Sequence, residues 1–230
     1  MKGDIELMKP IVIDISPRIN QCQKPQGWLG RVVLRLMNAR HSKVTDWGLS
    51  QVSVDQRDII LDVGCGGGRT VSKLAALATQ GKVYGVDYSK ESVAASNRTN
   101  RQWINTGRVE IQEASVSQVP FSEGMFDLVT AVETHFWWPN LPADMQEILR
   151  VLKPGGTLVI IAEVYKGANT ATAKLVEKHL PLSGMKLLSA EEHRELFANA
   201  GYSQIQIIEQ PGKGWICGIG RKPSRPMGPT

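Results

Sequence analysis

A glycine-rich segment that follows a short apolar run is the part of the chain best suited to chemistry. Residues 59–63 are apolar except for Asp62, and four of the five residues 64–68 are glycine. Glycines let the backbone turn sharply and let a ligand approach the peptide groups closely. A helix start then offers free N–H groups to a negatively charged ligand. The segment therefore predicts a strand, a tight turn and a helix start that bind a nucleotide-type cofactor.

A second candidate is Asp87, which ends the strand-like run 82–87 and lies nineteen residues beyond Gly68. A carboxylate at the end of the second strand can accept hydrogen bonds from both ribose hydroxyls of an adenosine. The alternative is that Asp87 caps the helix that follows. Glycine loop and acid together favour the ribose role, which both NAD and S-adenosylmethionine would satisfy.

Arg69 and Asp62 distinguish between these two cofactors. Arg69 stands where the dinucleotide fingerprint G-x-G-x-x-G/A has its last small residue, and an arginine there opposes the close packing of helix on strand. Asp62, just before the loop, suits a cationic amino-acid tail better than a pyrophosphate. Both observations favour S-adenosylmethionine.

Strand-like and helix-like segments alternate along the chain, which predicts the fold class. We expect strands at 59–63, 82–87, 108–112, 126–132 and 157–162, and helices at 70–78, 89–104, 144–152 and 189–200. Two further strands, 203–209 and 215–220, are separated by too short a link for a crossover helix, so they should pair antiparallel. The prediction is an α/β, Rossmann-like, doubly wound sheet of seven strands, mostly parallel with an antiparallel C-terminal strand.

These motifs, in this order, resemble those of the class I S-adenosylmethionine-dependent methyltransferases, in particular the small-molecule, ubiquinone/menaquinone-methyltransferase-like group. The matching segments are 60–68, 83–89, 119–121, 126–129 and 150–156, within roughly residues 58–165. The resemblance implies a cofactor site in which the glycines line the methionine tail, Asp62 lies near its amino group, Asp87 binds the ribose and Tyr88 lies beside the adenine.

The family often has an Asp that contacts the adenine amine where this chain has Ser115, so the Ser115 hydroxyl or the Val116 backbone would make this contact. Cys65 lies in the glycine loop, where a small residue fits, and we expect no nucleophilic role for it. The expected cofactor-binding residues are Asp62, Gly64, Cys65, Gly66, Gly68, Asp87, Tyr88, Ser115 and Val116.

The segment after the fourth strand predicts the acceptor site, since ligands of open α/β sheets bind at the carboxyl ends of the strands. His135 can act as a base near neutral pH, and Glu133 can do so if burial raises its pKa, or can hold an acceptor amine. Trp137 and Trp138 would wall the pocket or meet a cationic substrate. The alternative is that Glu133 caps or binds the cofactor tail and the aromatic residues only pack.

The region before the glycine loop predicts a cap. Residues 28–54 have a helical pattern that Gly48 should divide into two helices, and they include His41. We expect residues 1–54 to form an N-terminal arm and helical cap over the acceptor site, with His41 as a substrate-binding residue. Residues 55–222 would be the methyltransferase domain and 223–230 a tail.

Composition excludes several other classes of protein. The 230 residues are 42% hydrophobic with a net charge of +5, and no apolar run approaches the ~20 residues of a membrane span. Three distant cysteines and four scattered histidines have no metal-ligand spacing, so no metal is predicted. The N-terminus lacks the apolar core of a signal peptide, and we expect a cytoplasmic protein.

The leading hypothesis is methyl transfer from S-adenosylmethionine to a small-molecule acceptor by an in-line SN2 displacement. RNA or protein methylation is the first alternative; the pI of about 9.2 permits it, but there is no basic–aromatic interleaving typical of nucleic-acid binding. A non-catalytic S-adenosylmethionine-binding protein and, more remotely, a nicotinamide oxidoreductase are the others. The sequence leaves the acceptor, the methylated atom and the oligomeric state open.

Overall fold

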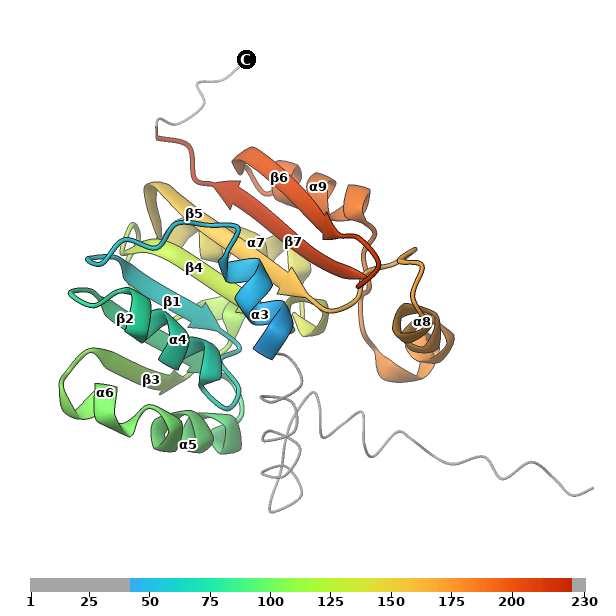
Figure 1. Ribbon diagram of the computed structural model, residues 1–230. Coiled ribbons are helices and arrows are strands. Elements are labelled where there is room, and N and C mark those ends of the chain that lie inside the picture. The colour runs from blue at the N-terminus through green and yellow to red at the C-terminus, as the bar shows by residue number, and fades with distance from the viewer. Residues whose placement is uncertain (1–41, 225–230) are drawn as a thin grey trace, which may run out of the picture.

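The structure, a computed structural model, describes residues 42–224, apart from the side chains of residues 181–183. The described chain forms one seven-stranded sheet in the order β3-β2-β1-β4-β5-β7-β6 (Figure 1). β7 runs antiparallel to both of its neighbours, and the remaining strands are parallel to one another. The strands are β1 (Ile59–Val63), β2 (Lys82–Asp87), β3 (Val109–Glu113), β4 (Phe126–Val132), β5 (Leu152–Ala162), β6 (Ser203–Gln210) and β7 (Trp215–Arg221). The predicted sheet is confirmed, including its single reversed strand.

Helices cover both faces of the sheet (Figure 1). α3, α4 and α5 pack on one face, and α7 and α9 pack on the other. The helices are α3 (Ser42–Leu49), α4 (Arg69–Leu77), α5 (Lys90–Thr99), α6 (Arg101–Asn105), α7 (Leu141–Val151), α8 (Ala171–Ser183) and α9 (Ala190–Asn199), with single 3₁₀ turns η1 (Val116–Gln118) and η2 (His135–Trp137). Ser189 and Glu192 form a capping box at the start of α9.

Two buried clusters, one on each face, hold these layers together. Along β1, Leu61 and Val63 join the cluster on the α7 and α9 face, whereas Ile60 joins the cluster beneath α3 and α4. A strand that is covered on both faces needs apolar side chains in both directions, which is why β1, β4 and β5 are nearly continuous apolar runs. The carboxyl ends of these strands are thereby held rigidly at one edge of the sheet.

The strand expected at 157–162 begins earlier, at Leu152. α7 ends at Val151 and β5 begins at Leu152, so the Lys-Pro-Gly-Gly turn belongs to the start of a strand of 11 residues. Gly155 adopts a left-handed φ of 81°, its N–H donates to the Lys222 carbonyl, and the Lys222 N–H donates to the Gly156 carbonyl. The left-handed φ of Gly155 therefore bends the strand. The two glycines still belong to β5, because the chain that follows β7 supplies their hydrogen-bond partners.

Three other expectations about helices were wrong. The helix predicted over 89–104 is broken at Asn100, whose side chain donates to the Gly68 carbonyl at 2.9 Å. α8 was not predicted. Gly48 lies within α3, which ends one residue later, and residues 50–54 form no second helix. The part of the predicted cap before Ser42, including His41, lies outside the described residues.

Gly48→Ala should lower the free energy of unfolding by roughly 1–2 kcal/mol, although alanine is the better helix former. A Cβ at Gly48 would lie within 2.7 Å of three side-chain atoms of Ile161 in β5. Urea denaturation of the two proteins measures the difference. In an Ile161→Ala background the collision is removed, and the same substitution should become neutral or stabilising. An equal loss in both backgrounds would contradict this account of α3 packing.

Candidate cofactor and acceptor site

The loop between β1 and α4 is built from glycines in the left-handed region. Gly64, Gly66 and Gly68 have φ values of 69°, 50° and 80°, which residues with a Cβ rarely adopt. A Cβ at Gly64 would lie 2.8 Å from the Cβ of Thr134. The loop therefore needs glycine both for its backbone conformation and for its close approach to the end of β4.

Asp87, at the carboxyl end of β2, fixes this loop to the neighbouring strand. Its Oδ2 accepts a hydrogen bond from the Gly66 N–H and its Oδ1 accepts one from the Ser89 N–H, each at 2.9 Å. Burial raises the pKa of the carboxyl, and the two backbone N–H groups oppose that shift. The Ser92 side chain is a third hydrogen-bond partner of this carboxylate, and with about four lone-pair sites Asp87 can still accept a hydrogen bond from a ligand.

A cavity of about 280 Å³ opens beside this loop, at the carboxyl ends of β1, β2 and β4. Its lining includes seven residues that the sequence predicted, Gly64, Asp87, Tyr88, Ser115, Val116, Trp137 and Trp138. It also includes residues that sequence reasoning missed, Val63, Val86, Ala114, Thr134 and Pro139. Each missed residue is a sequence neighbour of a predicted residue near the end of a strand. This closeness in sequence could have identified them as lining residues.

Four other expected cofactor residues lie in or beneath the loop and do not line the cavity. Asp62 is 2% exposed and accepts a hydrogen bond from the Thr130 hydroxyl at 2.7 Å. Burial raises its pKa to about 7, and the charge of Asp87 adds to the shift. The Cys65 thiol is buried and its pKa is raised well above its usual value by burial and by the two nearby carboxylates, so it stays protonated. The other two are Gly66 and Gly68.

Two 3₁₀ turns close the other side of the cavity. Ser115 caps η1 by accepting a hydrogen bond from the Ser117 N–H at 3.2 Å, which holds Ser115 and the buried Val116 at the lining. Trp138 follows η2 and is 3% exposed, so its ring belongs to the core as well as to the wall. The cavity is therefore apolar on this side.

Glu133 lies at the end of β4 in a left-handed conformation with a φ of 57°, which is rare for a residue other than glycine. Its carboxylate accepts a hydrogen bond from the Glu163 N–H, just beyond β5, and it is not part of the cavity lining. This contact joins the ends of β4 and β5. The expected roles of Glu133 toward the acceptor and toward the cofactor tail stay predictions.

His135 is turned into the protein interior and is not part of the cavity lining. It is 1% exposed, and its Nε2 lies 3.0 Å from the Nε2 of His193 in α9. The His193 Nδ1 lies 2.7 Å from the Ser189 carbonyl, so Nδ1 must carry the proton of the neutral ring. The His193 Nε2 then accepts, and the His135 Nε2–H donates. The structure gives no support to the expected role of His135 as a base at the acceptor.

The remaining features set limits on the site. Within residues 42–224, no group of His, Cys, Asp and Glu side chains is arranged to hold a metal ion. The helices of this same part of the chain are all too short or too polar to cross a membrane. His41 lies outside the described residues, so its expected contact with substrate stays a prediction.

The parallel sheet with a reversed β7, the left-handed glycine loop and the acid at the end of β2 define a Rossmann-like, nucleoside-cofactor-binding domain. Comparison with known proteins narrows the class. Residues 61–160 match a protein-family model described as a methyltransferase domain. The O-methyltransferase cnsE of Penicillium expansum is 27% identical over 159 residues, covering 69% of this chain. The demethylmenaquinone methyltransferase of Oceanobacillus iheyensis is 26% identical over 210 residues, which are 81% of this chain and 87% of the relative.

A solved structure shows the same fold. The S-adenosylmethionine-dependent methyltransferase of Aquifex aeolicus aligns with a TM-score of 0.66 and 18% identity, covering 90% of this chain and 97% of that one. This chain spans 57% and 60% of the lengths of the O-methyltransferases of Penicillium expansum and Pyrenophora dematioidea. The matched domain, these relatives and this fold together support a class I S-adenosylmethionine-dependent methyltransferase.

Gly68→Ala should weaken S-adenosylmethionine binding, whereas Gly107→Ala should leave it unchanged. Both glycines have left-handed φ values, 80° and 75°, so both substitutions strain the backbone. Only at Gly68 would the new Cβ meet other atoms, among them the Ser96 Cα at 2.7 Å; around Gly107 there is open space. We expect at least a tenfold loss, about 1.4 kcal/mol, for Gly68→Ala in calorimetric titration. Equal affinities of the wild type and Gly68→Ala would show that the loop tolerates the shift that the new Cβ forces on it.

The contribution of His135 and His193 to stability should fall as the pH falls from about 7.5 to about 5.5, while Asp62, whose pKa is raised to about 7, contributes a change of the opposite sign. Burial holds the pKa of both histidines below the ordinary value of 6.5, and the charge of His193 lowers the pKa of His135 further. Below that value the unfolded chain binds protons that the folded chain does not, so the free energy of unfolding falls by about 1 kcal/mol per pH unit and histidine.

Urea denaturation at a series of pH values measures this slope. A His135→Gln/His193→Gln double variant has neither imidazole, so its stability should change less over the same range. If wild type and double variant have the same slope, the histidine pair is not the cause.

Proposed function

We propose that this chain transfers the methyl group of S-adenosylmethionine to a small-molecule acceptor by in-line displacement. The observation that carries the proposal is the Asp87 carboxylate, which bridges the Gly66 and Ser89 N–H groups and faces the cavity. When bound, S-adenosylmethionine supplies an activated methyl on a sulfonium. The protein must then bind the cofactor, align the acceptor and exclude water.

The donor and acceptor groups present fit that cofactor. Asp87 has lone pairs that can accept hydrogen bonds from the ribose hydroxyls. Tyr88 and Val116 would offer apolar surface to the adenine, and Ser115 would offer a hydroxyl. Asp62 is a buried acid next to the glycine loop with a single hydroxyl donor, Thr130. A ligand ammonium near it would favour the ionised form and offset the burial that raises its pKa to about 7.

We propose that the chain promotes the reaction mainly by alignment and by exclusion of water. The titratable residues that line the cavity within residues 42–224 are Asp87 and Tyr88, and the first is assigned to the cofactor. Trp137, Trp138 and Pro139 give the cavity an apolar wall where the acceptor would approach. In this proposal Glu133 and His135 are positioning residues, which tie the end of β4 to β5 and to α9.

Acceptor selection is assigned in this proposal to the N-terminal region. α3 lies at the carboxyl edge of the sheet, where Trp47 contacts Trp215 with ring centroids 5.9 Å apart. Asp46 also pairs with Lys73 of α4, the helix that follows the glycine loop. Residues 1–54 would then cap the acceptor site, with His41 among the substrate contacts, on a methyltransferase domain of residues 55–222 that is followed by a short tail.

Support for a small-molecule acceptor comes from the relatives, which include O-methyltransferases and a demethylmenaquinone methyltransferase. The direct test is transfer of labelled methyl from S-adenosylmethionine into separated small-molecule, RNA and protein fractions of a cell extract. We expect label in the small-molecule fraction. Label confined to RNA or protein would overturn the acceptor class, and cofactor binding with no transfer to any fraction would overturn the activity.

Asp87→Asn should weaken S-adenosylmethionine binding by about tenfold or more, or about 1.4 kcal/mol. The amide has the same shape, but its NH2 would face one of the two backbone N–H groups that now donate to the carboxylate. Calorimetry gives the affinity. Asp46→Asn is the matched control, because that exposed acid pairs only with Lys73 among the described residues and should change the affinity little.

A further inference from the structure

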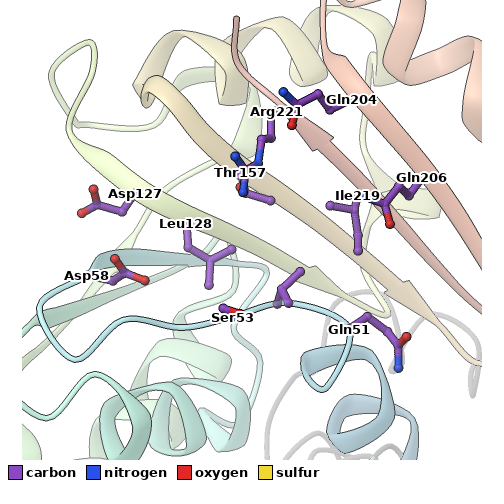
Figure 2. A pocket seen from close by; sticks show the side chains of 11 residues that line it. Gln51, Ser53, Asp58, Asp127, Leu128, Thr157, Gln204, Gln206, Ile219 and Arg221 are labelled. Carbon is purple, nitrogen blue, oxygen red and sulfur yellow. The ribbon is translucent and has the colours of Figure 1, made fainter. Parts of the chain in front are cut away.

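A second cavity, of about 330 Å³, lies near the amino ends of β1 and β4 and shares no lining residue with the cofactor cavity (Figure 2). The segment 51–53 forms one side, and strands β4, β5, β6 and β7 form the other. It lies on the α3 face of the sheet, because Leu128 and Ile219 in its lining belong to the cluster beneath α3 and α4. Its size is in the lower part of the range for small-molecule sites, ~300–1,000 Å³.

One end of this cavity has an excess of negative charge. Asp58 and Asp127 stand together at that end (Figure 2), and Asp55 is a close third acid. Lys153 is the cation there, with its Nζ 2.8 and 2.7 Å from the two carboxylate oxygens of Asp127. The pKa of Asp58 is raised, first by burial and then by the charges of Asp127 and Asp55. The acids are thus only partly neutralised, and a ligand cation would be favourable.

The other end presents a cation and neutral polar groups. Arg221, the last residue of β7, has no ion-pair partner within residues 42–224. Thr157 is its neighbour in the register of β5 and β7, and Gln204 lies beside it (Figure 2). A guanidinium in this setting can bind a carboxylate with two parallel hydrogen bonds.

The backbone beside Arg221 is irregular in a way that shapes this end. β6 has a register shift between Ser203 and Gln206, and Gln204 adopts a left-handed φ of 50°. Such bulges redirect side chains and concentrate at functional sites. Both Gln204 and Gln206 line the cavity; the Gln204 amide lies beside Arg221, and Gln206 lies opposite Ile219 (Figure 2).

An apolar floor joins the two ends. Leu128 of β4 is 3% exposed and lies between the acids and Arg221, whereas Ile219 of β7 is 5% exposed and lies on the other side of Arg221 (Figure 2). A hydrocarbon chain could lie on Leu128 without leaving a polar group unpaired. The cavity is thus negative at one end, and Leu128 separates that end from the positive charge of Arg221.

We propose that this cavity binds a small zwitterion, an amino acid whose ammonium and carboxylate are at opposite ends of a short hydrocarbon chain. The ammonium lies at Asp58 and Asp127, the carboxylate at Arg221, and the chain on Leu128. The site is separate from the methyl-transfer site, so the proposal does not rest on the proposed function.

The test is a titration of the full chain with β-alanine, 4-aminobutyrate, 5-aminopentanoate and 6-aminohexanoate, followed by calorimetry or NMR. S-adenosylhomocysteine at saturation keeps these compounds out of the cofactor site. We expect saturable binding with one preferred chain length, and binding at least about tenfold weaker for butylamine and butanoate, which each lack one charged end. Absence of saturable binding across the series, or equal binding of the single-ended compounds, overturns the proposal.

Arg221→Gln should weaken binding of the preferred compound by about tenfold. Asp58→Asn should also weaken this binding. Arg194→Gln is the matched control, because it removes the same charge from α9, on the opposite face of the sheet. Unchanged binding of S-adenosylhomocysteine shows that each variant is folded. If Arg221→Gln and Arg194→Gln behave alike, or if Arg221→Gln changes the oligomeric state without changing the titration, the cavity is not the site.

Discussion

The pair of hydrogen bonds from the Gly66 and Ser89 N–H groups to the Asp87 carboxylate is the constraint on which the cofactor site depends. It joins the turn after β1 to the turn after β2, and these turns would otherwise be separate loops. Because a carboxylate accepts both bonds, the left-handed glycine loop is held in one conformation while lone pairs remain for a ligand. In the proposed function, the same group therefore builds the site and takes part in recognition.

The opposite wall of the site is held from within the core. His135 and His193 tie η2 to α9 by a buried, neutral contact, and Glu133 ties the end of β4 to β5. These residues are polar, and their carboxylate and imidazole groups are of the kinds expected in a catalytic segment. In the structure their polar atoms are used to position the tryptophans and Thr134 around the cavity. A wall fixed in this way favours catalysis by alignment over catalysis by a mobile base.

The two edges of the sheet have different chemistry. At the carboxyl edge, strand ends, a helix start and glycines form a site of the kind that the doubly wound fold provides generally. Near the amino edge, the second cavity depends on features that belong to this chain, namely the bulge at Gln204, the cluster of acids around Asp58, and Arg221, which has no ion-pair partner among residues 42–224. The fold accounts for the first site, and the details of β6 and β7 account for the second.

The sequence by itself determined the sheet, its reversed strand, the glycine loop and the role of Asp87 as the acid after β2, because each depends on hydrophobic patterns and short-range spacing. It could not determine where β5 begins, since the partners of Gly155 and Gly156 come from Lys222, far along the chain. The direction of the His135 ring was also decided only by tertiary structure, because His193 is 58 residues away. Local pattern specifies which elements form, whereas the partner of a buried polar group is chosen by packing.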